Sequence, residues 1–419
     1  MRRQAFGREV SKLRMPEYVF ECISRLEAAG YSAYAVGGAV RDSLIGAEPS
    51  DWDVTTSAIP EAVMNIFADE RTVPTGLKHG TVTVLLPDGG VLRPIEVTTF
   101  RVDGEYRDVR HPDSVSFAAD VRDDLARRDF TVNAMAYSPS RGLVDAFGGA
   151  ADLEGRIIRA VGDARVRFSE DSLRIMRAFR FSAQLGFDIE ESTYLAACEK
   201  AHLIRNISRE RIGAELLKML GARAPAAALC KMVRGGVFAE AFGGISPDLD
   251  VVSRLDGTSD VSAEVRLAVL CFAMAESARA EFLSSLRLSN AQRKKVERFV
   301  AASGFVPMDG STLGAQARRF LHLYGDILRG AISMLEFSRG ECAGDLIREV
   351  LAQCVSDPPI NAARLAVRGS DLLPICGEHA LVGRVIAHLL ECVIDDPDKN
   401  ERDTLLSLAR EYIEGRRAE

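Results

Sequence analysis

The sequence predicts an α+β protein, with a mixed sheet and its helices at the start of the chain and helices alone in the rest. Residues 80–86 and 91–100 alternate between apolar and polar side chains around Asp88-Gly89-Gly90, which is a hairpin signal. After residue 152 the hydrophobic period changes from two residues to about 3.6, the period of a helix. The length of 419 residues is too great for one compact core and predicts about two to four domains.

The composition is that of a folded protein and excludes a globally basic nucleic-acid coat. Hydrophobic residues make up 47% and charged residues 27%, and the net charge is −7. A local basic track remains compatible with this balance. The eight cysteines are spaced singly, which favours reduced thiols in a cytoplasmic protein. No uncharged apolar run is long enough to span a bilayer, so no membrane partner is expected.

Turn and cap residues place the first elements. Pro16 and Gly30 bracket a helix over residues 17–29, and a strand follows at residues 31–36. Pro60 opens a short helix that ends near residue 67.

Asp51 and Asp53 form a metal-binding pattern. Residues two apart in a strand share one face, so the two carboxylates are expected to converge on one point. Mg²⁺ takes one or two protein carboxylates and completes its octahedron with water and phosphate oxygens. The pattern therefore predicts a magnesium site.

The residues just before this pair predict a phosphate site. Gly37 and Gly38 follow an apolar strand and open a short turn that carries Arg41. A backbone without Cβ can approach a phosphate closely and offer N–H donors at a helix start. With the aspartates, this stretch predicts a site for a nucleoside triphosphate and a metal.

Glu96 is the candidate third carboxylate. It stands between Ile95 and Val97, where a charge is costly unless it has a partner such as a metal or a hydroxyl. The alternative is that Glu96 faces water on an edge strand beside Pro94.

The order strand, Gly-Gly, Arg-Asp, strand, Asp-x-Asp resembles the signature of the polymerase-β-like nucleotidyltransferases. Within them it is similar to the class II branch, which contains bacterial tRNA nucleotidyltransferases and poly(A) polymerases. Residues 127–134 match the RRDFTxNA motif of that branch. The resemblance implies a head with a mixed five-stranded sheet, contact of Arg128 with the triphosphate, and a role for Asn133 in holding the ribose or the motif itself.

Residues 170–181 resemble the nucleotide-reading EDxLRxxRAxRF motif of the same family, on a helix predicted to run from Ser169 as N-cap to Leu185. Cytosine and adenine share an amine donor beside a ring-nitrogen acceptor, so Asp171 and Arg174 would favour them over uracil and guanine. Glu170 would fix the guanidinium of Arg174. The phosphates or the RNA end would be served by Arg177 and Arg180. The alternative is a salt-bridged solvent face.

Two other segments carry functional hypotheses. Residues 101–113 lack apolar periodicity and predict a mobile loop, which the resemblance associates with addition of the terminal A. Ser289 is a predicted N-cap, and residues 293–295 form a basic first turn that either contacts RNA backbone or is merely exposed. Residues 368–414 resemble the family's Gly-x-Asp-Leu tail, but Glu378-His379 replaces the usual Gly-Pro.

The resemblance implies template-independent addition of CCA to the 3′ end of tRNA from CTP and ATP, with Mg²⁺ held by Asp51 and Asp53 in a two-metal mechanism. The expected partners are the acceptor end and elbow of tRNA. The expected domains are a catalytic head, a helical neck, a helical body and a tRNA-binding tail, at residues 1–150, 151–220, 221–345 and 346–419. No His-Asp dipeptide occurs, so the phosphohydrolase module of some relatives is expected to be absent.

Alternatives to full CCA addition remain. These are a split-function enzyme that adds only CC or only A, a poly(A) polymerase, and a non-catalytic RNA-binding scaffold. The full-length loop at residues 101–113 argues against a CC-only enzyme, and the intact carboxylates argue against a scaffold.

Overall fold

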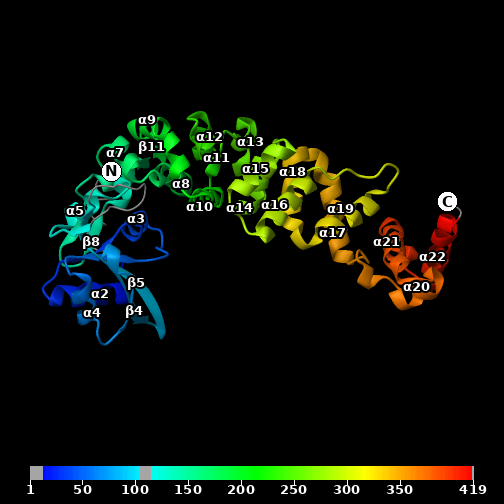
Figure 1. Ribbon diagram of the computed structural model, residues 1–419, viewed down its shortest axis with the longest axis horizontal. Helices are drawn as coiled ribbons and strands as arrows, with labels where there is room; N and C mark the ends of the chain where they lie inside the picture. The colour runs from blue at the N-terminus through cyan, green and yellow to red at the C-terminus, as the bar shows by residue number, and fades with distance from the viewer. Residues whose placement is uncertain (1–12, 104–114, 418–419) are drawn as a thin grey trace. The chain divides into compact units, whose positions relative to one another are not determined.

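The computed structural model describes residues 13–103 and 115–417, which fall into two compact units (Figure 1). Unit 1 is the described part of Met1–Leu249 together with Ser285–Arg287. Unit 2 consists of Asp250–Ser284 and the described part of Leu288–Glu419. The chain thus divides near residue 249, and the finer division into four domains stays a prediction.

Unit 1 begins with a mixed seven-stranded sheet in the order β3-β4-β5-β2-β1-β8-β9. The strands are β1 (Ala33–Val36), β2 (Asp53–Thr56), β3 (Arg71–Gly76), β4 (Thr81–Asp88), β5 (Val91–Thr99), β8 (Ala136–Ser138) and β9 (Gly142–Val144). Only β2 and β5 run parallel. The mixed sheet and the β4–β5 hairpin confirm the predictions, whereas the count of five strands is wrong. Strands β8 and β9 have three residues each, too few for an alternating pattern, and β3 is interrupted by Pro74 and ends at Gly76.

Helices cover the sheet and line one end of it. They are α2 (Glu17–Ala28), α3 (Gly38–Leu44), α4 (Pro60–Ile66) and α5 (Val121–Ala126). Helices α2 and α4 pack against the strands, and both are drawn in blue in Figure 1. Pro16 is the N-cap of α2 and not its first residue. The buried side of α2, with Val19, Ile23 and Leu26, supplies the apolar face that holds it on the sheet.

Helices dominate the rest of unit 1, as predicted. They are α6 (Gly149–Gly155), α7 (Ala164–Glu170), α8 (Leu173–Leu185), α9 (Glu191–Glu199), α10 (Arg209–Leu220), α11 (Pro225–Arg234) and α12 (Val237–Ala241). A small parallel pair, β10 (Ile157–Ile158) and β11 (Asp188–Ile189), is the exception. Helices α10 and α11 both pack against α8. The long helix α8 is therefore the central element of this part of the unit.

The helix predicted from Ser169 to Leu185 is two helices, so its predicted N-cap is wrong. Ser169 lies inside α7, and its hydroxyl donates to the carbonyl of Arg165. The chain is extended at Asp171, with φ −139° and ψ 100°, and the Asp171 carboxylate accepts from the N–H of Leu173. A short polar side chain that bonds the backbone two residues on competes with the helix and interrupts it here. Gly186 ends α8 with φ 65°, as predicted.

Unit 2 is helical throughout its described residues. Its helices are α14 (Ala263–Cys271), α15 (Glu276–Ser285), α16 (Asn290–Ser303), α17 (Leu313–Tyr324), α18 (Leu328–Arg339), α19 (Gly344–Ser356), α20 (Gly369–Cys376), α21 (His379–Asp395) and α22 (Arg402–Arg417); α13 (Leu249–Ser253) lies at the boundary between the units. The predicted N-cap Ser289 is confirmed by a capping box with Gln292. Separate apolar cores hold α16 to α19 and α20 to α22.

Two arginines of α17 tie these cores together. Arg318 is buried and donates to the carbonyls of Ile394 and Asp395 at the end of α21. Arg319 is 2.6 Å from Glu391 and 3.1 Å from Asp395. Positive charge at a helix C-terminus satisfies carbonyls that have no intrahelical donor.

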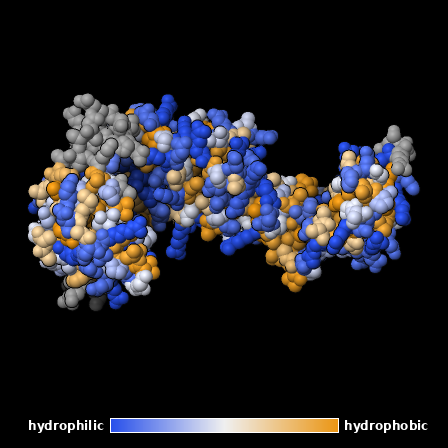
Figure 2. Space-filling view, turned by 60° about the horizontal axis from the view of Figure 1, so that its bottom comes forward, coloured by the Kyte–Doolittle hydropathy of each residue, from blue (hydrophilic) through white to orange (hydrophobic). Residues whose placement is uncertain are grey.

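The visible surface is mostly hydrophilic, with separate hydrophobic patches (Figure 2). Across the described residues, no single helix is long and apolar enough to cross a membrane. Helices α20 and α21 reach that length and hydropathy only as a pair, and they meet at a bend of 116°. Both contribute buried residues to the core that they share with α22.

We expect Gly330→Ala to destabilise unit 2. A Cβ on Gly330 would lie against the ring of Phe299 and 2.8 Å from Val265 Cγ2, so α18 would have to move away from α16 and α14. Overpacking of this kind costs about 1–3 kcal/mol, measured as the free energy of unfolding in urea. The control is Gly344→Ala, whose nearest new contact would be at 3.7 Å. Equal stability of the two variants would contradict the packing described.

Candidate active site

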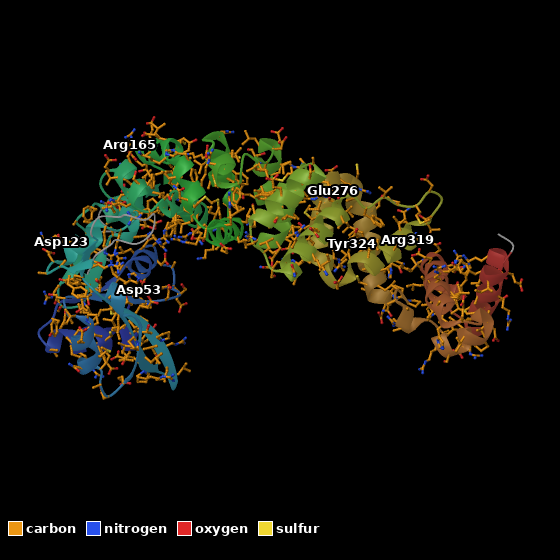
Figure 3. All side chains as sticks on the ribbon, viewed as in Figure 1. Asp53, Asp123, Arg165, Glu276, Arg319 and Tyr324 are labelled. Atoms are coloured by element: carbon orange, nitrogen blue, oxygen red, sulfur yellow. The ribbon has the colours of Figure 1, made fainter. Side chains whose placement is uncertain are left out.

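The carboxylates predicted to bind a metal come together at the parallel pair of strands. Asp53 is the first residue of β2 and is the register partner of Glu96 on β5 (Figure 3 labels Asp53). Asp51 precedes the strand and does not lie within it, and its carboxylate accepts from Ser50 Oγ at 2.8 Å. Because β5 lies between β4 and β2, the alternative is wrong in placing Glu96 on an edge strand, but it is right that the Glu96 side chain is exposed to water.

The electrostatics of this edge suit a cation. The side chain of Asp53 keeps a surface open to solvent, yet surrounding protein atoms displace much of its water. This desolvation and the negative charges of Glu96 and Asp51 raise the pKa of Asp53 to about 6, against the opposing charge of Arg128. A bound cation would relieve this repulsion. The residues therefore fit a divalent metal.

The protein supplies only part of a coordination sphere. Within residues 13–103 and 115–417, no group of three or more His, Cys, Asp or Glu side chains forms a ready metal cage. Mg²⁺ in nucleotide enzymes commonly takes one or two carboxylates and leaves the other positions to water and phosphate. The incomplete set is in keeping with a metal that arrives with its substrate.

The glycine turn lies directly against an arginine of the RRDFTxNA motif. Gly37 has φ 75°, a conformation that glycine adopts readily, and a Cβ there would be 3.0 Å from Arg128 Nη1. Gly38 is the first residue of α3. Arg128 thus lies against the turn formed by Gly37 and Gly38, although it is more than 80 residues from them in sequence.

Arg41 is used mainly inside the protein. It is 9% exposed, and it donates from Nε to Asp42 at 2.8 Å and from Nη1 to Asn133 Oδ1 at 2.6 Å. The amide nitrogen of Asn133 in turn donates to Asp129 Oδ1 at 3.1 Å. This geometry supports the prediction's second reading, in which Asn133 helps to hold the motif itself.

Asp129 joins the motif to helix α8. Its Oδ1 also accepts from the N–H of Phe130, and its Oδ2 accepts from Arg177 Nε at 2.8 Å and Nη2 at 2.5 Å. Burial alone would raise the pKa of Asp129, but the charge of Arg177 and hydrogen bonds from Asn133, Arg177 and Phe130 outweigh it and lower the pKa to about 2. Arg177 is consequently held by a carboxylate that is ionised under all ordinary conditions.

Arg174 is fixed from two sides. Nη1 donates to Glu170 Oε2 at 3.0 Å, which confirms the predicted pairing, and Nη2 donates to the carbonyl oxygen of Arg127 at 2.8 Å. Asp171 stands at the break between α7 and α8, 4.0 Å from Arg211 Nη2. The two predicted base-reading residues therefore lie at one helix start, and the guanidinium of Arg174 is held in place before any nucleotide arrives.

Arg180 points into the protein. It is 7% exposed, with Nε 2.5 Å from Glu215 Oε2 and Nη1 2.6 Å from Gln184 Oε1. Its guanidinium lies 3.9 Å from the centre of the Phe181 ring. These contacts engage the Arg180 guanidinium within the protein, and its contact with phosphate or RNA stays a prediction. Glu215, 35 positions along the chain, carries no local signal that would have revealed the pairing.

Phe181 is a site residue that sequence reasoning did not single out. The guanidinium carbons of Arg41 and Arg177 lie 5.3 Å and 5.2 Å from the centre of its ring. An aromatic ring at this distance attracts cations and positions them. An aromatic residue within a helix so rich in arginine was the available clue.

With this geometry in place, comparisons with known proteins identify the family. Residues 33–159 match the model of the poly A polymerase head domain, and residues 186–251 match the model of a probable RNA and SrmB-binding site of polymerase A. The chain is 35% identical to the CCA-adding enzyme of Lactiplantibacillus plantarum, over 93% of this chain and 94% of that protein. The chain belongs to the CCA-adding enzyme family.

Other members agree in sequence and in fold. The CCA-adding enzyme of Geobacillus stearothermophilus is 34% identical, over 91% of this chain and 94% of that protein. The crystal structure of the Bacillus stearothermophilus CCA-adding enzyme in complex with CTP superimposes with a TM-score of 0.78 at 31% identity, covering 96% and 98% of the two chains. The Thermotoga maritima CCA-adding enzyme complexed with tRNA has the same fold, with a TM-score of 0.70 at 21% identity.

The predicted loop at residues 101–113 is described only at its start. Residues 104–113 lie outside the described residues, while Arg101–Asp103 form strand β6 paired with β7 (Val115–Phe117).

The basic turn of α16 forms ion pairs within the protein. In it, Arg293 is 2.9 Å from Glu297, and Lys295 is 4.0 Å from Glu264. These pairs support the exposed-face alternative, and the RNA contact stays a prediction.

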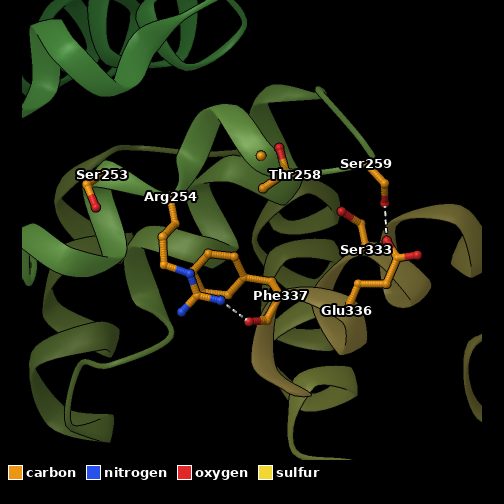
Figure 4. Close-up of a pocket in the computed structure, with 8 residues that line it drawn as sticks. Ser253, Arg254, Thr258, Ser259, Ser333, Glu336 and Phe337 are labelled. Atoms are coloured by element: carbon orange, nitrogen blue, oxygen red, sulfur yellow. Dashed lines mark hydrogen bonds between the residues drawn. The ribbon is translucent and has the colours of Figure 1, made fainter. Parts of the chain in front are cut away.

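A cavity of about 370 Å³ lies in unit 2, among residues with no assigned role in the CCA-adding chemistry (Figure 4). Arg254 donates to the carbonyl of Phe337 and lies 4.1 Å from the centre of that ring, and Ser259 donates to Glu336. The hydroxyls of Ser253, Thr258 and Ser333 bond groups outside the lining, namely the carbonyls of Asp250 and Leu255 and the N–H of Asp260. Its lining is Ser253, Arg254, Gly257, Thr258, Ser259, Ser333, Glu336 and Phe337.

We expect Asp129→Asn to lower the free energy of unfolding by about 2 kcal/mol near neutral pH, since a pKa shift of one unit corresponds to about 1.4 kcal/mol. The folded-state pKa of about 2 lies below the ordinary 3.8, so the stabilisation is complete above the higher value and is lost as the pH falls through the lower. Urea unfolding at a series of pH values should show that the difference in the free energy of unfolding between the two proteins begins to shrink below about pH 4 and is lost near pH 2. A difference independent of pH would contradict the ion pair with Arg177.

Proposed function

We propose that this protein adds C, C and A to the 3′ end of tRNA from CTP and ATP, releasing pyrophosphate and using no nucleic-acid template. One observation carries the proposal: the paired carboxylates Asp53 and Glu96 lie in a chain that matches CCA-adding enzymes over more than nine-tenths of its length. Its partners are then CTP, ATP and tRNA, whose acceptor end reaches the head and whose elbow reaches the helical tail. Eight free thiols suit a cytoplasmic location.

The carboxylate edge is the reaction centre of this proposal. Asp51 and Asp53 hold Mg²⁺, which when bound activates the 3′-hydroxyl and neutralises charge on the triphosphate. Glu96, beside Asp53 in register, acts as a further ligand or as the base that takes the hydroxyl proton. The rigid parallel pairing of β2 and β5 keeps the carboxylates at a constant separation, so most of the rate comes from positioning and charge stabilisation.

The phosphates occupy the glycine turn. The backbone N–H of Gly38 at the start of α3, with Arg128 against the turn, offers a donor and positive charge for the triphosphate, whereas the N–H of Gly37 donates to the carbonyl of Met135. Arg41 and Arg177 support this surface from behind, through Asn133 and Asp129.

Base selection is assigned to Asp171 and Arg174. The carboxylate accepts from the exocyclic amine of cytosine or adenine, and the guanidinium donates to the neighbouring ring nitrogen. Uracil and guanine present a carbonyl and a protonated nitrogen instead, which leaves the protein groups unpaired. The bonds of Arg174 to Glu170 and to the Arg127 carbonyl hold it in the orientation that such reading requires.

The test of the activity is incubation with a tRNA that lacks its 3′ CCA, with each nucleotide supplied singly and then together, followed by sequencing of the products. Addition of CC with CTP alone and of the complete CCA with both nucleotides is the expected result. CC alone, A alone, or a run of A would establish instead a split-function enzyme or a poly(A) polymerase. No addition by the folded protein would leave an RNA-binding scaffold.

We expect Asp51→Ala and Asp53→Ala to lower nucleotide transfer by at least about a hundredfold, because each removes a ligand of the metal that activates the hydroxyl and neutralises the triphosphate. Folding and tRNA affinity should change little, since neither side chain belongs to the apolar core. Asp88→Ala on the β4–β5 hairpin is the matched control, because Asp88 carries the same charge on the same sheet and pairs with the exposed Arg93. Full activity in either of the first two variants would remove that residue from the metal site.

We expect Asp171→Asn combined with Arg174→Gln to raise incorporation of UTP and GTP relative to CTP and ATP. Each unpaired buried group costs about 1–3 kcal/mol, which corresponds to about one to two decades in rate. The amide oxygen of the new Asn can still accept from the N–H of Leu173, so the helix start survives. Overall activity should fall, because Glu170 loses Arg174 and keeps only its pair with Arg167 among these two arginines. An unchanged preference at lower rate would place base selection elsewhere.

A further inference from the structure

Asp124 is a fully buried carboxylate of helix α5 to which no role in the reaction has been assigned. Its Oδ1 accepts from Arg127 Nε at 3.0 Å and Nη2 at 2.6 Å. Its Oδ2 accepts from Arg128 Nη2 at 3.2 Å and, more weakly, from Thr55 Oγ1 at 3.4 Å. Three N–H donors from two arginines therefore converge on one carboxylate, and the Thr55 hydroxyl, whose one proton is shared with the carbonyl of Thr98 at 3.2 Å, lies beside them.

Each of these donors leads to a different part of the active site. Thr55 lies two residues after Asp53 on β2, so the two side chains share a face of the strand. Arg128 lies against Gly37, at the proposed triphosphate site. The backbone carbonyl of Arg127 is the acceptor for Arg174 Nη2.

The base-reading helix start is anchored to the same turn a second time. Arg167 of α7 donates to the carbonyl of Ala126 at 3.3 Å and pairs with Glu170 at 2.8 Å. Glu170 is the partner of Arg174. In this short segment at the end of α5, Arg128 carries the guanidinium proposed to bind phosphate. The carbonyls of Ala126 and Arg127, just before it, hold Arg167 and Arg174 at the proposed base-reading site.

Asp124 holds this turn by charge. Burial would raise the pKa of Asp124, but the charges of Arg128 and Arg127 lower it below its ordinary value, so the carboxylate is ionised. Without it, two arginines would lie side by side with no common counterion. Repulsion between them would move the Arg127 backbone and the Arg128 side chain together.

We propose that Asp124 is a positioning residue that couples triphosphate binding to base selection, by orienting Arg128 directly and Arg174 through the carbonyl of Arg127. The inference rests on the proposed roles of Arg128 and Arg174. It adds that the two roles are not independent, because one carboxylate sets the geometry of both. When Arg128 binds the triphosphate, the base of the same nucleotide then lies at a defined distance from the proposed base-reading residue Arg174.

The test uses Asp124→Asn, which keeps the size of the side chain and removes its charge. We expect the ratio of kcat/KM for CTP over UTP, measured on tRNA lacking CCA, to fall by about tenfold. Inhibition by inorganic pyrophosphate, which has no base, should weaken by a similar factor. A merely structural role would reduce the active fraction and change neither quantity.

Asp152→Asn is the matched control. Asp152 is likewise buried and accepts from a threonine and an arginine, Thr131 at 2.6 Å and Arg159 at 3.1 Å. Its arginine has no proposed contact with the nucleotide. The control should leave both the CTP-to-UTP ratio and pyrophosphate inhibition unchanged once corrected for the folded fraction, and an equal change in both variants would overturn the proposal.

Arg127→Gln separates the two effects proposed for Asp124, on Arg128 and on Arg174. It also tests the proposal if Asp124→Asn does not fold. It removes the guanidinium that ties the Arg127 backbone to Asp124 and leaves Arg128 its carboxylate. We expect a lower CTP-to-UTP ratio with unchanged pyrophosphate inhibition. An unchanged ratio in this variant would overturn the coupling.

A double-mutant cycle places the effect on Arg174. In an Arg174→Gln background, Asp124→Asn should cause no further loss of selectivity, because the residue through which it acts is already gone. Additive losses would overturn the route through Arg127. Absence of CCA addition by the wild-type protein, or normal selectivity in Arg174→Gln alone, would instead refute the proposed function, so the two failures are distinguishable.

Discussion

The burial of charge at the junction between the sheet and helix α8 is the constraint on which the rest of the site depends. Asp124 and Asp129 are buried, and each is shared by groups that belong to different elements. An ionised group removed from water is tolerated only when its partners surround it closely. The conformation of the RRDFTxNA segment is therefore tightly restricted, because any displacement would leave a carboxylate or an arginine unpaired.

The edge that carries Asp53 and Glu96 follows the opposite rule. There, burial and the charges of neighbouring acidic groups raise the pKa of Asp53, while Arg128, whose charge opposes this rise, is engaged by Asp124. Protein groups neutralise the interior and leave an excess of negative charge at the surface that meets the substrate. Such an excess is what a divalent cation and its phosphates can satisfy, and what a closed ion pair could not.

Helix α8 connects these two environments. Its start is defined by Asp171, which interrupts the chain between α7 and α8, and its side chains Arg174 and Arg177 reach the carbonyl of Arg127 and the carboxylate of Asp129. Phe181 then offers one ring to Arg177, Arg41 and Arg180. The proposed base reader is in this way built on a helix and oriented by contacts within the protein, which lowers the cost of ordering it.

The sequence by itself determined the elements whose signals are local. The hairpin at Asp88-Gly89-Gly90, the end of α8 at Gly186 and the cap at Ser289 follow from the backbone preferences of a few neighbouring residues. The motifs indicated the family and predicted roles for Asp53 and Arg174, and the apolar neighbours of Glu96 made that carboxylate a candidate. Tertiary structure alone decided that Glu96 lies on an inner strand, that Asp171 breaks a helix and that Arg180 is paired with Glu215. It also decided the convergence on Asp124, since charges far apart in sequence find their partners only when the chain has folded and water has been excluded between them.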